Sequence, residues 1–147
     1  MQTEKMPEEI AVVLTRVIWG AMILGQVAFL VTAWAIRGAA APVAILGVLV
    51  TVGMALVTAA VPGAFLLRHV LLRARPVSVG RYRLGHVLPL AALEAPSLLA
   101  VVALLIGANA LPVLLIPAVA IAAQVAMFPT AAPFSAAGKD YFRVGER

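Results

Sequence analysis

The sequence has no cysteine, few charged residues and few aromatic residues. Without cysteine, the 147-residue chain cannot form a disulfide, a cysteine-ligated zinc site or an iron–sulfur cluster. Charged residues make up 12% of the chain and hydrophobic residues 64%, and the mean hydropathy is +1.09. Soluble domains carry about twice this share of charge, so the composition indicates an integral membrane protein. We expect a single membrane domain over residues 1–147.

The chain also lacks the sequence patterns that accompany catalysis. It contains no nucleophile–base pair, no phosphate-binding loop and no dinucleotide-binding fingerprint. His69 and His86 are isolated from other metal-ligating residues. We therefore expect a protein that is not an enzyme and that has neither a cofactor nor a metal. The net charge of +5 does not indicate nucleic acid as a partner, because the basic residues lie at the ends of apolar segments.

Four apolar segments are present, and each is long enough to be read as a transmembrane helix. They predict an all-α fold, a polytopic membrane protein whose four transmembrane helices form two helical hairpins. The expected spans are residues 17–36, 43–67, 84–107 and 111–128, with a polar tail over residues 129–147. Pro7, Glu8 and Glu9 favour a first helix that begins ahead of its apolar part.

Basic residues are distributed unevenly between the two sides that four spans would define. Of the 11 Lys and Arg residues, all but Arg37 fall on one side. The positive-inside rule then places both termini and the loop over residues 68–83 in the cytoplasm. The abundance of Ala, Val, Leu and Arg is typical of a GC-rich bacterial gene, so we expect a multi-pass protein of a bacterial cytoplasmic (inner) membrane.

The basic loop over residues 68–83 has two possible roles. It is either a docking surface for anionic lipid or a cytosolic partner, or only an orientation signal. Its arginines are Arg68, Arg73, Arg75, Arg81 and Arg83.

Glu94 is the only acidic residue inside an apolar segment. It follows Arg83 by eleven residues, which is about 16 Å along a helix and about half of a hydrocarbon core. A charge at that depth is costly, so an acid there indicates a functional site. In one interpretation Glu94 carries a proton or cation, being neutral in lipid and ionised when water or a cation reaches it. In the other it stays protonated in a hydrogen bond to a second helix, for which Gln26, Thr51 and Thr58 are candidate partners.

Small residues recur at every fourth position in two of the apolar segments. Ala55, Ala59 and Gly63 form one such ridge. Ridges of this kind let transmembrane helices approach closely, so we expect a role in helix packing, although abundant alanine can also produce the spacing by chance. The second ridge consists of Ala118, Ala122 and Ala126.

A basic turn, Arg73-Ala74-Arg75-Pro76, precedes a helix that reads Leu90-Ala91-Ala92-Leu93-Glu94-Ala95. In this respect residues 73–105 resemble the proteolipid ring subunit (subunit c) of rotary ATP synthases. In that family an Arg-x-Pro-like turn leads into a helix with one acidic residue. The resemblance implies that Glu94 is the ion-carrying carboxylate. The resemblance can reflect either common ancestry or convergence on an apolar sequence pattern.

The first helix of that family carries alternate glycines, which permit a tight ring. Gly47, Gly53 and Gly63 of this chain do not have that spacing. We therefore expect a possible distant or repurposed relative and not a working rotor of an ATP synthase.

The expected function is that of a small non-enzymatic integral membrane subunit with a proton- or cation-responsive carboxylate at Glu94. Its expected partners are the lipid bilayer and either further copies of the chain or other subunits of a membrane complex. The alternative is a structural or accessory four-helix membrane protein in which Glu94 keeps a fixed interhelical hydrogen bond.

Overall fold

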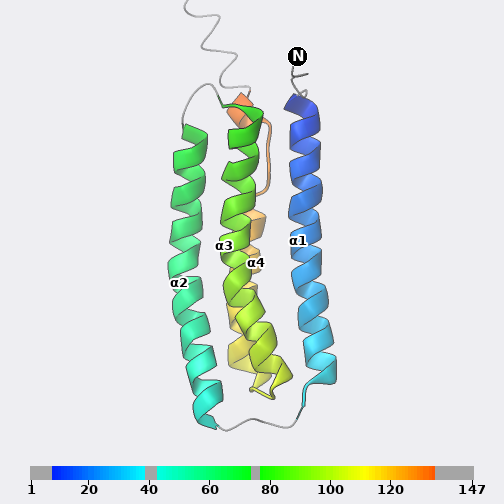
Figure 1. Ribbon diagram of the computed structural model, residues 1–147, viewed down its shortest axis with the longest axis vertical. Coiled ribbons are helices and arrows are strands. Elements are labelled where there is room, and N and C mark those ends of the chain that lie inside the picture. The colour runs from blue at the N-terminus through cyan, green and yellow to red at the C-terminus, as the bar shows by residue number, and fades with distance from the viewer. Residues whose placement is uncertain (1–7, 39–42, 74–76, 135–147) are drawn as a thin grey trace, which may run out of the picture.

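A computed structural model of the protein describes residues 8–38, 43–73 and 77–134. Its long helices are α1 (Glu8–Ile36), α2 (Val43–Arg73), α3 (Val79–Leu105) and α4 (Ala110–Ala126) (Figure 1). The predicted all-α fold is confirmed, and α1, α2 and α3 are long and apolar enough to cross a membrane. With 17 residues, α4 is shorter than the other three, so four crossings of the membrane stay a prediction.

Helix α3 is the centre of the bundle and packs against α1, α2 and α4. Helices α1 and α3 begin at the end of the bundle where α2 ends, so α1 runs parallel to α3 and α2 runs antiparallel to it (Figure 1). A short turn joins α3 to α4. It is possible because Gly107 adopts a φ of 89°, which disfavours any residue with a side chain, and because the Asn109 side chain accepts a hydrogen bond from the Leu111 N–H.

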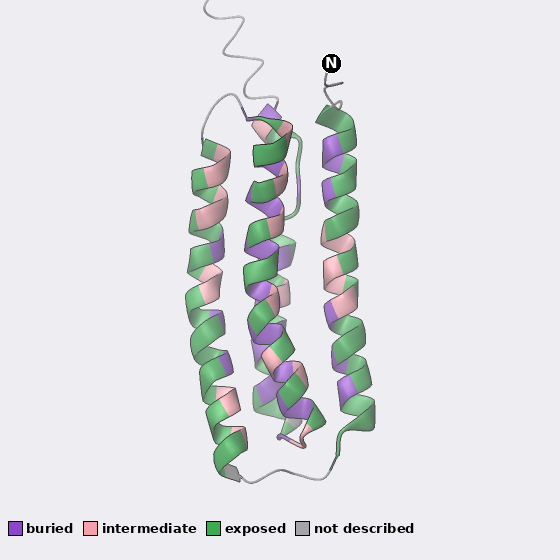
Figure 2. Ribbon diagram, in the orientation of Figure 1, coloured by how far each residue is buried: buried purple, intermediate pink, exposed green. Residues whose placement is uncertain are grey.

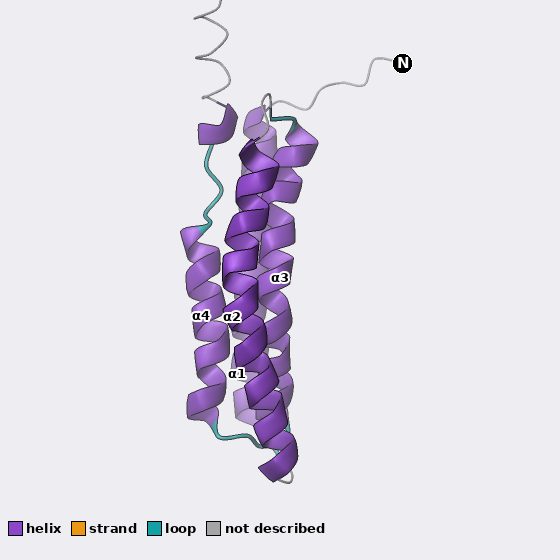
Figure 3. Ribbon diagram, turned by 90° about the vertical axis from the view of Figure 1, so that its left-hand side faces the viewer, coloured by secondary structure: helices purple, strands orange, loops and turns teal. Residues whose placement is uncertain are grey.

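The chain leaves α4 as a non-helical segment that continues along the bundle. Proline at position 129 has no N–H and disfavours a helical conformation of Phe128, so the helix stops just before this pair. Residues 127–134, here called the C-terminal strap, then extend beside the other helices toward the end where α1 begins (Figure 3). The last described residues form a short turn in which the Phe134 N–H donates to the Ala131 carbonyl.

The basic loop is shorter than the sequence analysis predicts. Helix α2 continues to Arg73 and α3 already begins at Val79, where the Ser78 side chain accepts a hydrogen bond from the Arg81 N–H. The flanking Leu, Val and Arg residues are compatible with a helix, so the change from apolar to polar residues does not mark the helix end. Arg75 lies outside the described residues.

The end of the bundle where α2 ends and α3 begins is therefore rich in arginine. We call it the basic end, and it is defined by Arg16, Arg68, Arg73, Arg81 and Arg83. Among the described residues the opposite end has Arg37, whose guanidinium lies 5.7 Å from the Trp34 ring centroid. The uneven distribution of basic residues along the sequence thus corresponds to one arginine-rich end of the bundle and one arginine-poor end.

Most large apolar residues of α1 and α2 are exposed, and much of both ribbons carries the colour of exposed residues in Figure 2. Only 11% of the most apolar window of α2 is buried inside the chain, against 44% for α3. An apolar surface of this extent must be covered by lipid or by other chains. The exposure supports a membrane protein whose inner helix is α3 and whose outer surface faces hydrocarbon.

Two glycines, and not the predicted ridge, allow close approach between helices of one chain. A Cβ atom on Gly85 would lie 2.8 Å from the Leu72 side chain, and one on Gly53 would lie 2.6 Å from the Ile116 side chain. By contrast, Ala55, Ala59 and Gly63 are all exposed. The second ridge, Ala118, Ala122 and Ala126, is exposed as well. A role for either ridge in packing against another chain stays a prediction.

Candidate functional site

Glu94 lies in the middle of α3, about 16 Å along the axis from the end of the helix at Leu105. Its side chain is half-buried. In the part of the chain that the structure describes, no group donates a hydrogen bond to its carboxyl or forms an ion pair with it. The Glu94 carboxyl therefore lies at mid-helix without a hydrogen-bond partner among the described residues.

Gln26 lies on α1 at the level of Glu94. At one end of the bundle the Gly38 N–H donates to the Leu105 carbonyl at 3.1 Å, and at the other Val12 shares a packed cluster with Tyr82. Because both helices rise by about 1.5 Å per residue and run parallel, a residue of α1 lies level with the α3 residue about 67 to 70 positions later. This relation places Gln26 level with the turn of α3 that contains Glu94.

The amide of Gln26 has no hydrogen-bond partner. The side chain is only 1% exposed, and both Nε2 and Oε1 are buried without a donor or acceptor in reach. A buried amide of this kind costs about 1–3 kcal/mol relative to a paired one, so it is expected where a group or molecule from outside the chain completes the site. The amide offers both a donor and an acceptor, which is the complement of a protonated carboxyl.

The two threonines considered as partners do not join this site. Thr58 is exposed on α2, and its hydroxyl donates to the Met54 carbonyl of its own helix at 2.8 Å. Thr51 is exposed as well. Pro96 leaves a backbone acceptor free near Glu94. A proline inside α3 has no N–H, so it cannot donate to the carbonyl of Ala92, one turn earlier. The candidate site is therefore the Glu94 carboxyl, with the Ala92 carbonyl on the same turn of α3 and the Gln26 amide at the same level on α1.

A second polar cluster holds the C-terminal strap at the basic end. Three helices each supply one side chain that contacts a backbone carbonyl of the strap. Arg16 Nε of α1 donates to the Pro129 carbonyl at 3.0 Å, and the Tyr82 hydroxyl of α3 donates to the Thr130 carbonyl at 2.9 Å. A terminal nitrogen of Arg68 on α2 lies 3.5 Å from the Phe128 carbonyl. The strap therefore joins all three long helices.

His86 occupies the inside of this cluster and is buried. Its Nδ1 lies 2.9 Å from the Tyr82 carbonyl, and its Nε2 lies 3.4 Å from a terminal nitrogen of Arg68. A carbonyl only accepts and a guanidinium only donates, so these partners require a proton on Nδ1 and a lone pair on Nε2. His86 is thus assigned as a neutral imidazole that positions Arg68.

Aromatic rings and a second glutamine extend the cluster toward the middle of the bundle. Trp19 packs edge-to-face on Phe128 with a centroid distance of 5.0 Å, and its indole N–H donates to the Gln124 carbonyl at 2.9 Å. The Gln124 side chain donates from Nε2 to the Leu90 carbonyl at 3.3 Å. Unlike Gln26, this buried glutamine therefore has a fixed partner for its amide N–H.

The sequence analysis did not identify Tyr82, His86, Trp19 or Gln124 as parts of a site. The spacing of Tyr82 and His86, four residues apart, places both on one face of a helix and was the available signal. Comparisons with protein-family models, with curated proteins and with solved structures find no match for this chain. The function is therefore argued from the geometry of Glu94 and Gln26.

Proposed function

We propose that this protein is a small non-enzymatic integral membrane subunit in which Glu94 is the proton- or cation-responsive group. One observation carries the proposal: a carboxyl without a partner lies at mid-helix, level with a buried amide that also has none. An ionised acid at such a depth is costly in hydrocarbon, so Glu94 is neutral there and ionises when water or a cation reaches it. Gln26 lies at the same level of the bundle, and neither of its amide atoms is hydrogen-bonded to any group that the structure describes.

The proposal includes assembly with further copies of the chain or with other membrane subunits. Glu94 is half-buried, so part of its side chain faces outward, where a neighbouring subunit would cover it. The exposed ridge of Ala55, Ala59 and Gly63 offers a surface on which a second helix can approach closely. The resemblance of residues 73–105 to the proteolipid ring subunit supports the same arrangement.

The alternative, a structural or accessory protein, requires a fixed interhelical hydrogen bond to Glu94. The described part of the chain provides no such bond. The two possibilities differ in what Glu94→Ala does to the stability of the bundle. A lost interhelical hydrogen bond would cost about 1–2 kcal/mol, whereas a carboxyl without a partner can be removed at a cost within about 0.5 kcal/mol. Thermal unfolding in detergent measures this difference.

The reactivity of Glu94 tests the proposed role directly. A hydrophobic carbodiimide modifies protonated carboxyls in apolar surroundings, so Glu94 should be the main modified residue in intact membranes, with Glu8 and Glu9 as internal controls. Modification mapped by mass spectrometry should be strongest at Glu94, and Glu94→Gln should remove it. Absence of modification at Glu94 across the pH range in which the protein stays folded would refute the proposal.

We also propose four crossings of the membrane, with both termini in the cytoplasm. Helix α4 spans only about 26 Å, less than a hydrocarbon core of about 30 Å, but the strap continues from it toward the basic end. Cysteine at Asn109 should then react with an impermeant reagent added outside intact cells, and cysteine at Gly80 should not. Both positions are exposed, so an inverted labelling pattern would contradict this orientation.

A further inference from the structure

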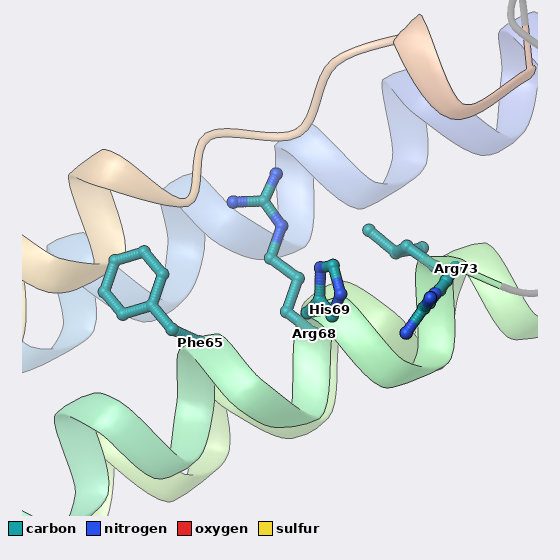
Figure 4. A pocket seen from close by; sticks show the side chains of 5 residues that line it. Phe65, Arg68, His69 and Arg73 are labelled. Carbon is teal, nitrogen blue, oxygen red and sulfur yellow. The ribbon is translucent and has the colours of Figure 1, made fainter.

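An open pocket of about 830 Å³ lies beside the last turns of α2, at the basic end (Figure 4). None of the described residues that line it is acidic. Glu8 and Glu9 line a different pocket, together with Arg16, and Glu94 lies at mid-bundle. No carboxylate among the described residues therefore compensates the positive charge in the α2 pocket. Its lining residues are Phe65, Arg68, His69, Leu72 and Arg73.

Two groups that do not line the pocket hold the Arg68 side chain in place. One terminal nitrogen contacts His86 Nε2 of α3 and the Phe128 carbonyl of the strap. These contacts fix the direction of the guanidinium, and its other N–H groups form no hydrogen bond with the residues that the structure describes. A planar guanidinium with free N–H groups matches the oxygens of a phosphate, and Arg73 and His69 line the same space.

The pocket is apolar on the side that faces the middle of the bundle. Phe65, which lines it, is 42% exposed, and Leu66 next to it is 64% exposed. This apolar surface continues along α2, where little of the helix is buried. A ligand that matches both the arginine-containing part and the apolar part of the pocket has an anionic head and a hydrocarbon chain. The arginine-rich position at one end of a membrane bundle is also where lipid headgroups lie.

We propose that this pocket binds the phosphate group of an anionic phospholipid whose acyl chains lie along the exposed surface of α2. Free inorganic phosphate shares the charge of this ligand but makes no use of Phe65 and Leu66. The proposal rests on the end of α2 and does not depend on the role of Glu94.

Two single substitutions provide a matched test. Arg73→Gln and Arg81→Gln each remove one positive charge from an exposed position at the basic end, but only Arg73 lines the pocket. The purified full-length protein would be incubated with equal amounts of phosphatidylglycerol and phosphatidylcholine carrying identical acyl chains, and bound lipid would be counted by native mass spectrometry. We expect the unmodified protein to retain phosphatidylglycerol in preference to phosphatidylcholine.

Arg73→Gln should lower phosphatidylglycerol binding about tenfold, and Arg81→Gln less than about twofold, because a direct charge-assisted contact is far stronger than a general surface charge. Equal losses in the two variants, or no loss in Arg73→Gln, would overturn the proposal. Inorganic phosphate added in excess should leave the lipid bound. Full displacement by phosphate alone would show a free-phosphate site and contradict the assignment to lipid. Equal melting temperatures of the two variants verify that both are folded.

Discussion

The basic end and the middle of the bundle are stabilised by different interactions. At the basic end, side chains from α1, α2 and α3 contact backbone carbonyls of the strap, and His86 adds a further link to Arg68. In the middle, helices meet through apolar side chains and alanine, and both the Glu94 carboxyl and the Gln26 amide have no partner. Proteins satisfy most of their buried polar groups, so a buried group without a partner calls for an explanation. The comparison shows side-chain-to-strap hydrogen bonds at the basic end and, at the level of Glu94, a buried amide with none among the described residues.

Substitutions that disrupt packing at the basic end should lower the free energy of unfolding most. Tyr82 is fully buried, donates to the Thr130 carbonyl and packs on His86 and Phe134. Tyr82→Ala should lower the free energy of unfolding by about 3–5 kcal/mol through the loss of this packing. Tyr82→Phe, which removes only the hydroxyl, should cost about 1 kcal/mol. Unfolding followed by circular dichroism in detergent measures both, and an Ala variant as stable as the Phe variant would contradict the described packing.

The two buried glutamines sharpen the comparison because Gln124 Nε2 donates a hydrogen bond, whereas Gln124 Oε1 and both amide atoms of Gln26 have no partner among the described residues. Gln26→Leu removes an amide without hydrogen bonds and should raise the free energy of unfolding by about 1–3 kcal/mol. Gln124→Leu loses the hydrogen bond to the Leu90 carbonyl and should lower it by about 0.5–1.5 kcal/mol. The same unfolding assay compares the two variants. If both substitutions changed the free energy of unfolding in the same direction, the two buried amides would not differ in hydrogen bonding as described.

The exposed ridge of α2 should affect association without affecting the fold of one chain. Ala59→Leu places a larger side chain at an exposed position of α2, so the melting temperature should change little. If the ridge packs against a second chain, the oligomer mass in native mass spectrometry should fall. Ala91→Leu, at an exposed position of α3, is the matched control. An unchanged oligomer mass in Ala59→Leu would show that the ridge faces lipid.

Part of this arrangement was predictable from the sequence, and the limits have physical causes. Long apolar runs predict the helices, and a single acid among them predicts Glu94 as a candidate site. The direction in which Thr58 points was not predictable, because a helix that is apolar on all sides carries no pattern that sets its rotation. The contacts of Arg16, Arg68 and Tyr82 were not predictable either, since their partners are backbone carbonyls of the strap, which every residue possesses.

The central claim is the proposal that Glu94 is the proton- or cation-responsive group of this protein and is protonated inside the bilayer. Isotope-edited infrared spectroscopy of the protein in lipid bilayers, with carbon-13 in the glutamate side chains, observes the carbonyl band of a protonated carboxyl directly. At neutral pH we expect such a band in the unmodified protein and its loss in Glu94→Gln. If the glutamate signal is that of ionised carboxylates alone, Glu94 is not protonated in the membrane and the account is wrong.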